Sequence, residues 1–183
     1  IYRYAATATG LLSTDKPEGS FIPVDSPRGS GYVDTAYLTE TVDLNHFMED
    51  PRPGLLVRRL RDALETGEDI RPYISPRGLV VALVDEPLLI SPNRLIGSLA
   101  AATPGRDTAT VALQIDVFEM LRQALLDLAD VTPAMAHSRA ALIPTQLWNF
   151  PYLSIQAPGH QPWLIHFEYI KDKPYITGIS LDQ

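Results

Sequence analysis

The sequence predicts an α+β protein in two parts, a small β-barrel-like unit followed by a cone-shaped domain of helices packed on a curved antiparallel sheet. Three observations indicate this fold class. Short apolar pieces separated by Gly, Pro, Ser and Asp fill roughly the first forty residues. Apolar residues at helical spacing follow from residue 55 onward. The chain ends in two apolar-rich runs with β-favouring residues over 163–182, which is typical of a β-hairpin.

Length, composition and charge exclude some classes of function. The 183 residues suffice for one domain, or for a small module plus one compact domain. A hydrophobic content of 45% with 20% charged residues is typical of a globular core. The net charge of −7 argues against a nucleic-acid partner, because binding to phosphates depends on clustered Lys and Arg. The one basic cluster, Arg58-Arg59-Leu60-Arg61, is interpreted as the solvated face of a helix.

Cysteine and membrane-spanning segments are both missing from the sequence. The absence of Cys excludes disulfides, thiolate metal sites and cysteine nucleophiles. No apolar run approaches the roughly 18–20 residues that a membrane-spanning helix needs. The chain opens on Ile1 with no initiating Met and no signal-like segment, which leaves room for a segment removed upstream of Ile1, including one that carries a lipid anchor.

The first part is predicted to consist of strands over 1–6, 21–24 and 31–38. Its end resembles the closing segment of bacterial Src-homology-3-like domains, in Gly31-Tyr32-Val33 followed by Tyr37-Leu38. The run from Gly19 to Val24 takes the place of that family's Trp-containing strand, with Phe21 instead of the usual Trp. The resemblance implies a partial module of this type over residues 1–42.

The second domain is predicted to span residues 54–183, after a linker of turn and breaker residues over 45–54. Its first helix follows from the spacing of its apolar residues and ends at Gly67, a natural stop. A short helical turn over 69–75 is expected to end at Pro76. The apolar positions of the first helix are Leu56, Leu60, Ala63 and Leu64.

Strands and helices are expected to alternate in the middle of the chain. Two short strands over 79–84 and 88–90 are separated by Glu86-Pro87. Ser91 as N-cap and Pro92 at the first helical position predict a helix from Pro92 to about Ala102. It should bury Leu95, Ile96 and Leu99. Alternation of Val111, Leu113 and Ile115 predicts a strand, and a helix is expected to begin near Asp116.

The last third is predicted to form a three-stranded meander, preceded by a loop over 131–146. The strands are expected over 148–156, 163–170 and 175–181, with a hairpin loop over 171–174. Side chains alternate along a strand, so the two faces of the middle strand can be listed separately. Trp163, Ile165, Phe167 and Tyr169 should face a covering helix, whereas Leu164, His166, Glu168 and Ile170 should border a cavity or solvent.

This order of elements suits the cone-shaped fold of nuclear-transport-factor-two-like and cystatin-like proteins. Three further pieces carry a resemblance to a known family: Ala63-Leu64 with Tyr73 to Leu79, Asn149-Phe150-Pro151 with Pro158-Gly159, and Trp163 to Glu168 with Gly178-Ile179 and Asp182-Gln183. They resemble an uncharacterised family of secreted bacterial lipoproteins, although Ser180-Leu181 stands where that family often has a His. The resemblance implies an extracytoplasmic or cell-surface location; the cytoplasm is the other possibility.

Standard catalytic and metal signatures are absent, so neither a cofactor nor a metal is predicted. There is no phosphate-binding or dinucleotide-binding glycine loop, no His-Glu-x-x-His and no Gly-x-Ser-x-Gly. The four histidines, His46, His137, His160 and His166, share no metal-ligand spacing. A faint likeness of Tyr2-Arg3 and Gly31-Tyr32-Val33 to ADP-ribosyltransferase toxins lacks the Glu-x-Glu or Gln-x-Glu pair which arginine-specific enzymes of that family need.

The candidate catalytic residues are His166 and Glu168, which project to one face of a strand and could form a general-base pair. If that face is concave, Tyr175 or Asp182 could stand nearby. The favoured interpretation is that the pair makes cross-strand hydrogen bonds or is solvated. Asp85-Glu86 is interpreted as a polar turn, because adjacent strand residues point to opposite faces.

Aromatic residues are the candidates for ligand binding, since binding pockets favour them. Packing in the core is their more common use. The candidates are Trp148, Tyr152, Trp163 and Tyr175, with Phe150 in the same aromatic set.

These observations predict an extracytoplasmic binding or envelope-associated protein without an evident catalytic site. Its partner is expected to be a cell-wall component, a protein or a small ligand. The alternative is a small-molecule-binding or isomerase-like enzyme that uses the cavity of the cone domain. A closed apolar cavity with His166 and Glu168 pointing into it would favour the enzyme, and solvated positions for both would count against it.

Overall fold

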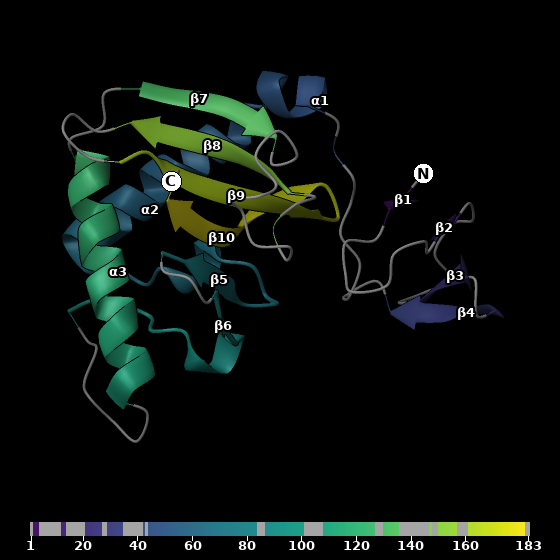
Figure 1. Cartoon of the computed structure of the whole chain (residues 1–183), viewed down its shortest axis with the longest axis horizontal. Helices are drawn as coiled ribbons and strands as arrows, with labels where there is room; N and C mark the ends of the chain where they lie inside the picture. Colours follow the sequence, from purple (N-terminus) through teal and green to yellow (C-terminus); the bar gives the residue numbers. More distant parts are fainter. Residues whose placement is uncertain are drawn as a thin grey trace.

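The computed structural model of this chain is an α+β protein, as the sequence predicts (Figure 1). It contains a four-stranded sheet and a six-stranded sheet. The residues that it describes are 2–3, 12–13, 21–26, 29–34, 42, 44–83, 87–100, 108–126, 130–135, 147, 150–156 and 161–181.

The four-stranded sheet comes from the start of the chain. Its strands are β1 (Tyr2–Arg3), β2 (Leu12–Ser13), β3 (Phe21–Ser26) and β4 (Gly29–Asp34), in the order β1-β2-β3-β4. All neighbouring strands are antiparallel. The predicted strand over 21–24 is therefore confirmed, whereas Tyr37 and Leu38 lie outside the described residues.

The six-stranded sheet has the order β6-β5-β10-β9-β8-β7, which Figure 1 shows from bottom to top. Only β5 and β10 are parallel, and the other neighbours are antiparallel. The predicted meander of β8, β9 and β10 is confirmed. The strands are β5 (Leu79–Ala82), β6 (Leu88–Ile90), β7 (Asp130–Met135), β8 (Pro151–Gln156), β9 (Trp163–Ile170) and β10 (Lys173–Leu181).

The turn between β9 and β10 is shorter than predicted. Lys171 and Asp172 alone form it, with φ values of 52° and 59°. Two consecutive residues with positive φ match the right-handed twist of a hairpin, so the strands can pair directly on either side. Lys173 and Pro174, which were expected in the loop, therefore already belong to β10.

The described residues include three α-helices beside the sheet: α1 (Leu44–Glu49), α2 (Arg52–Thr66) and α3 (Thr108–Leu126). The predicted stop of α2 at Gly67 is confirmed, and Gly67 has the left-handed φ of 76° that suits glycine. The segment predicted as a linker instead contains α1. Phe47 of that helix is buried, and its ring centroid lies 5.8 Å from that of Phe167, so this segment is part of the core.

The helix predicted from Pro92 to Ala102 is wrong. In the described part of this run, residues 92–100, the only helical turn is the 3-10 turn η3 (Pro92–Arg94), and Leu95 is extended. Tertiary hydrogen bonds replace the helical ones: Gln114 accepts one from the Ile96 N–H at 2.9 Å and donates one to the Arg94 carbonyl at 3.0 Å. Leu95 and Ile96 are nevertheless buried, as expected.

The strand predicted over 111–115 and the helix start near Asp116 are also wrong, because both regions lie within α3. Val111 and Ile115 are four residues apart, a spacing that fits one face of a strand or of a helix, and Phe118 three residues further on shares only the helical face. Leu113, the middle residue of the alternation, is 37% exposed. Three alternating residues are too few to separate the two periods.

Part of the predicted loop over 131–146 is a strand. β7 begins at Asp130 and includes Pro133, which pairs with Leu153. Because β7 is an edge of the sheet, it tolerates a proline that donates no hydrogen bond. Residues 136–146 lie outside the described part.

The six-stranded sheet is covered on both faces around β9. Trp163, Ile165, Phe167 and Tyr169 are all buried in the main core, together with apolar residues of α2 and α3, so the predicted helix-facing side is confirmed. The opposite face was expected to border a cavity or solvent, but Leu164, His166 and Glu168 are buried there. Leu147 and Phe150 pack on that face in a second cluster.

Candidate functional site

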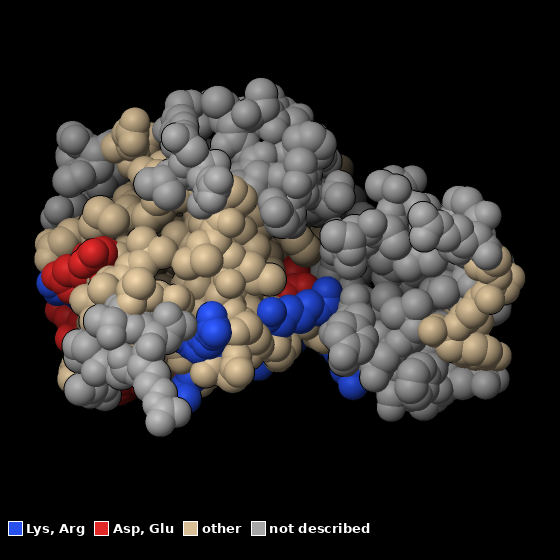
Figure 2. Space-filling view, turned by 60° about the horizontal axis from the view of Figure 1, so that its bottom comes forward, with Lys and Arg blue, Asp and Glu red and all other residues tan. Residues whose placement is uncertain are grey.

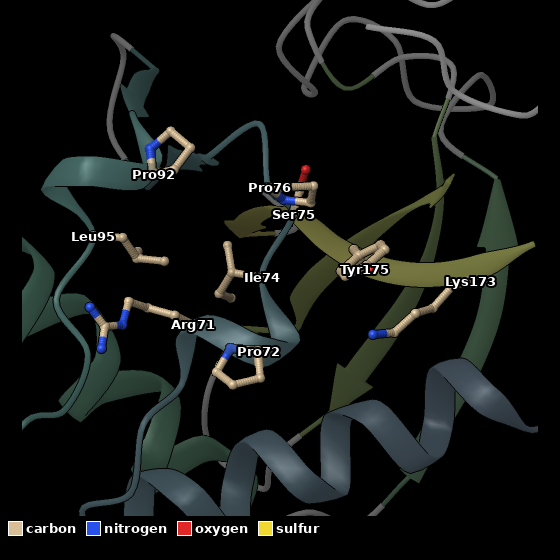
Figure 3. A pocket seen from close by; sticks show the side chains of 9 residues that line it. All are labelled: Arg71, Pro72, Ile74, Ser75, Pro76, Pro92, Leu95, Lys173 and Tyr175. Atoms are coloured by element: carbon tan, nitrogen blue, oxygen red, sulfur yellow. The ribbon is translucent and has the colours of Figure 1, made fainter. Parts of the chain in front are cut away.

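A cleft of 410 Å³ lies at the start of β10, where segments distant in the sequence meet. The short helix η2 (Arg71–Tyr73) and the residues after it form one side, η3 and Leu95 form another, and β10 forms the third (Figure 3). The lining residues are Arg71, Pro72, Ile74, Ser75, Pro76, Pro92, Leu95, Lys173 and Tyr175.

The segment after η2 reaches the cleft because it joins the sheet beside β10. Ile74 forms a parallel bridge with Ile176, and the Ser75 N–H donates to the Ile176 carbonyl at 2.8 Å. Gly78 then turns the chain into β5 with a φ of 110°. A Cβ at Gly78 would lie 2.3 Å from the Ile90 carbonyl oxygen, so only glycine lets this turn pack on β6. These contacts fix Ser75 at the inner end of the cleft.

Behind the cleft lies a set of three polar side chains, of which Ser75 and Glu168 are buried and Arg77 is partly buried. The Ser75 hydroxyl donates a hydrogen bond to Oε1 of Glu168 and accepts one from the Arg77 N–H at 3.0 Å. Arg77 Nη1 lies 3.1 Å from Oε2 of Glu168. Burial lowers the pKa of Arg77, and the Glu168 carboxylate opposes this shift. Glu168 is thus engaged on both oxygens, by a hydroxyl and by a guanidinium.

His166 belongs to a different buried group on the same sheet face. Its Nε2 lies 3.0 Å from the Ser180 hydroxyl, and its ring centroid is 5.3 Å from that of Tyr152. Burial lowers the pKa of His166 to about 3, and the nearby Phe150 backbone offsets this only partly. Nδ1 is buried, and no hydrogen bond of normal distance and angle joins it to a described residue. The ring is therefore neutral at physiological pH.

The surroundings of His166 are tightly packed. Gly178 lies directly opposite His166 across the β9–β10 pair. A Cβ at Gly178 would be 2.4 Å from a methyl carbon of Leu147. Glycine is needed there because Leu147 fills the space above the strand.

The two predicted catalytic residues share a strand face, as expected from the alternation of side chains. They do not act on each other, since His166 bonds Ser180 whereas Glu168 bonds Ser75 and Arg77. Neither residue lines the cleft, although Glu168 contacts Ser75, which does.

The predicted aromatic ligand-binding residues are separated in the structure. Tyr175 lines the cleft. Tyr152 and Trp163 are buried in different clusters on opposite faces of the sheet. Trp148 lies outside the described residues, as do Asp85, Glu86, His137, His160 and Asp182.

The sequence interpretation missed the charged and proline residues of the cleft. Arg71 and Lys173 are more than one hundred positions apart and come together only because η2 and β10 meet. The nearest signal was the run from Tyr73 to Leu79, which indicated a resemblance to a family but did not indicate a binding site. Three prolines in short connecting segments, Pro72, Pro76 and Pro92, were a further sign of rigid turns.

A second polar cluster ties α2 to the β9–β10 turn. Arg52 bonds the Asp50 carboxylate at 2.9 Å and the Asp172 carbonyl at 2.6 Å, and Tyr169 donates to Asp50 at 2.8 Å. Burial alone would raise the pKa of Asp50, but the hydrogen bonds from Arg52 and Tyr169 lower it overall. This cluster holds the turn that precedes Lys173.

Comparisons with protein-family models, curated proteins and solved structures find no match to this chain. Within the described ranges, no helix has the length and apolar character of a membrane span, and no group of three or more His, Asp or Glu could hold a metal. On the described part of the face shown in Figure 2, basic side chains are scattered over a surface made mostly of uncharged residues.

Proposed function

We propose that this chain is a binding protein and that the cleft at the start of β10 holds a small ligand. The observation that carries the proposal is the composition of the lining. Apolar walls from Ile74, Leu95 and three prolines are combined with a few polar groups. Ligand sites are typically concave and mostly apolar, with a small number of placed polar groups, and have volumes of about 300–1,000 Å³. The cleft, at 410 Å³, lies at the small end of that range.

The inner end of the cleft is rigid, which favours binding. Ser75 is held by its backbone bond to Ile176 and by its side-chain contacts with Glu168 and Arg77. Prolines on either side of Ser75, in η2 and at Pro76, restrict the backbone further. A site whose walls are already ordered loses little conformational entropy when a ligand binds.

The lining favours binding over catalysis. Among the lining residues that the structure describes, there is no His, Asp or Glu to act as a general base. Glu168 lies behind Ser75 and is paired with Arg77, and His166 is neutral and packed elsewhere. The isomerase-like enzyme stays a prediction.

We also propose a fold for each part of the chain and a location for the protein at the cell surface. A partial Src-homology-3-like module over residues 1–42 is supported by an antiparallel sheet that contains Gly31-Tyr32-Val33. A cone-type domain over 54–183 is supported by α2 and α3 packed against the meander. The cell-surface setting rests on the sequence resemblance, and co-sedimentation with cell-wall fragments tests it. Absence of retention would count against a cell-wall partner.

A pair of proline variants tests the cleft as the binding site. Pro92→Trp places a large side chain at the exposed rim, and Pro87→Trp makes the same change at an exposed position outside the lining. We expect small aromatic probes, phenylacetate and phenylacetamide, to shift the backbone amide NMR signals of the non-proline residues within 71–75 and 173–175 in the parent and in Pro87→Trp. Pro92→Trp should abolish these shifts. If neither probe perturbs these amides in the parent, the proposal is wrong.

A further inference from the structure

We propose that the ligand of the cleft is a small organic monoanion, a carboxylate on a compact apolar body, with Lys173 as its anchor. This rests on the proposed function of the cleft. Among the described residues that line the cleft, two are cations, Arg71 and Lys173, and none is acidic. The charge balance of these two cations decides which kind of ligand the site suits.

The charge of Arg71 is already matched. Its Nε donates to both oxygens of Asp69 at 2.9 and 3.1 Å, and its Nη2 donates to Asp69 at 2.8 Å. The guanidinium also packs on Gly97, where an added Cβ would lie 3.2 Å from three of its atoms. Figure 3 shows the guanidinium pointing away from the middle of the cleft. Arg71 therefore forms a wall and contributes little net charge.

Lys173 is different. Its Nζ lies 4.7 Å from the centroid of the Tyr175 ring and pairs with no carboxylate among the described residues. The side chain extends toward the middle of the cleft in Figure 3. A cation over an aromatic face is attracted by the ring, so Tyr175 restrains the ammonium without neutralising it.

Among the described residues that line the cleft or lie directly behind it, the charges leave an excess of one positive charge. Arg71 balances Asp69, Arg77 balances Glu168 behind Ser75, and Lys173 remains. A carboxylate matches one positive charge, whereas a phosphate monoester carries close to two negative charges at neutral pH. The apolar walls at Ile74 and Leu95 then accommodate the rest of the ligand, with its carboxylate at the Tyr175 end.

Three probes that share one phenyl ring but differ in charge test the ligand class: phenylacetate, the neutral phenylacetamide and phenyl phosphate. NMR titration of the whole chain gives the affinity of each from the amide shifts of the cleft residues. We expect phenylacetate to bind more tightly than phenylacetamide by on the order of fivefold, the value of a partly exposed ion pair. Lys173→Gln should remove this difference. Lys171→Gln, the same change at an exposed lysine outside the lining, should keep it.

The outcomes distinguish the ligand class from the site itself. Equal affinity for phenylacetate and phenylacetamide in the parent would overturn the monoanion while leaving the cleft as a binding site. Tighter binding of phenyl phosphate would overturn it in favour of a dianion. A preference for phenylacetate that survives Lys173→Gln would overturn the role of Lys173. If none of the probes reaches the cleft, both the ligand class and the proposed function fail.

Discussion

The buried pair of Arg77 and Glu168 allows a quantitative test of how the inner end of the cleft is held. Arg77→Met keeps most of the side-chain volume but removes the guanidinium. The Glu168 carboxylate is then left in the interior, with the Ser75 hydroxyl as its remaining side-chain partner. We expect this variant to be much less stable than one in which Glu168 is changed.

The size of the effect follows from burial. Removing one partner of a buried ion pair costs about 3–5 kcal/mol, because the other charge stays buried without compensation. The Arg77 side chain is 23% exposed, so water can enter and the cost should fall near the lower end, about 3 kcal/mol. Glu168→Gln removes the buried charge and still accepts a hydrogen bond from Ser75, so it should cost only about 1–2 kcal/mol.

Urea denaturation followed by tryptophan fluorescence measures the free energy of unfolding of the parent, both single variants and the double variant. The double variant should lose about 2 kcal/mol less than the sum of the single variants, because the unpaired carboxylate no longer exists. Arg59→Met, at an exposed position of α2, is the control and should change stability by less than about 0.5 kcal/mol. Additive losses within about 0.5 kcal/mol would refute the claim that the two charges stabilise each other.

Two further predictions concern the packed side of the sheet. The pKa of His166 is about 3 in the folded chain and near 6.5 when unfolded, so the unfolded state binds the extra proton between these values. The free energy of unfolding should therefore fall as the pH drops from 6.5 toward 3, by up to about 1.4 kcal/mol per pH unit from His166. In denaturation curves recorded across this pH range, His166→Gln should flatten the dependence of stability on pH. An unchanged dependence would contradict the buried neutral ring. Gly178→Ala should cost about 1–3 kcal/mol in the same assay, because its Cβ would lie 2.4 Å from Leu147, and a neutral result would show that Leu147 can move aside.

Parts of the candidate site could be predicted from local sequence. Alternation along β9 placed His166 and Glu168 on one face, and the structure agrees. Their partners could not be predicted in this way. Ser75 is 93 positions from Glu168 and reaches it only because the segment after η2 pairs with β10. A local pattern of side chains cannot predict this contact, because it joins segments 93 positions apart that meet only through the parallel pairing of Ile74 with Ile176.

The errors in the fold arose where local patterns were short and distant contacts were strong. The run from Pro92 has a good N-cap and a proline at the first helical position, yet Gln114 takes the hydrogen-bonding groups of Arg94 and Ile96. The turn-rich segment around Phe47 forms a helix, and the Phe47 ring packs on Phe167 in the core. In both places a tertiary partner outweighed a weak local preference.

The sequence by itself determined the α+β class, the end of α2 at Gly67 and the β9–β10 hairpin with its helix-facing side. These features follow from interactions within a few residues, such as side-chain alternation and the φ that glycine permits. Only the tertiary structure decided that the second face of β9 is buried, that Glu168 pairs with Arg77 and that Lys173 shares a cleft with Arg71. Burial and ion pairing depend on which distant segments meet, and that is settled by the packing of the whole chain.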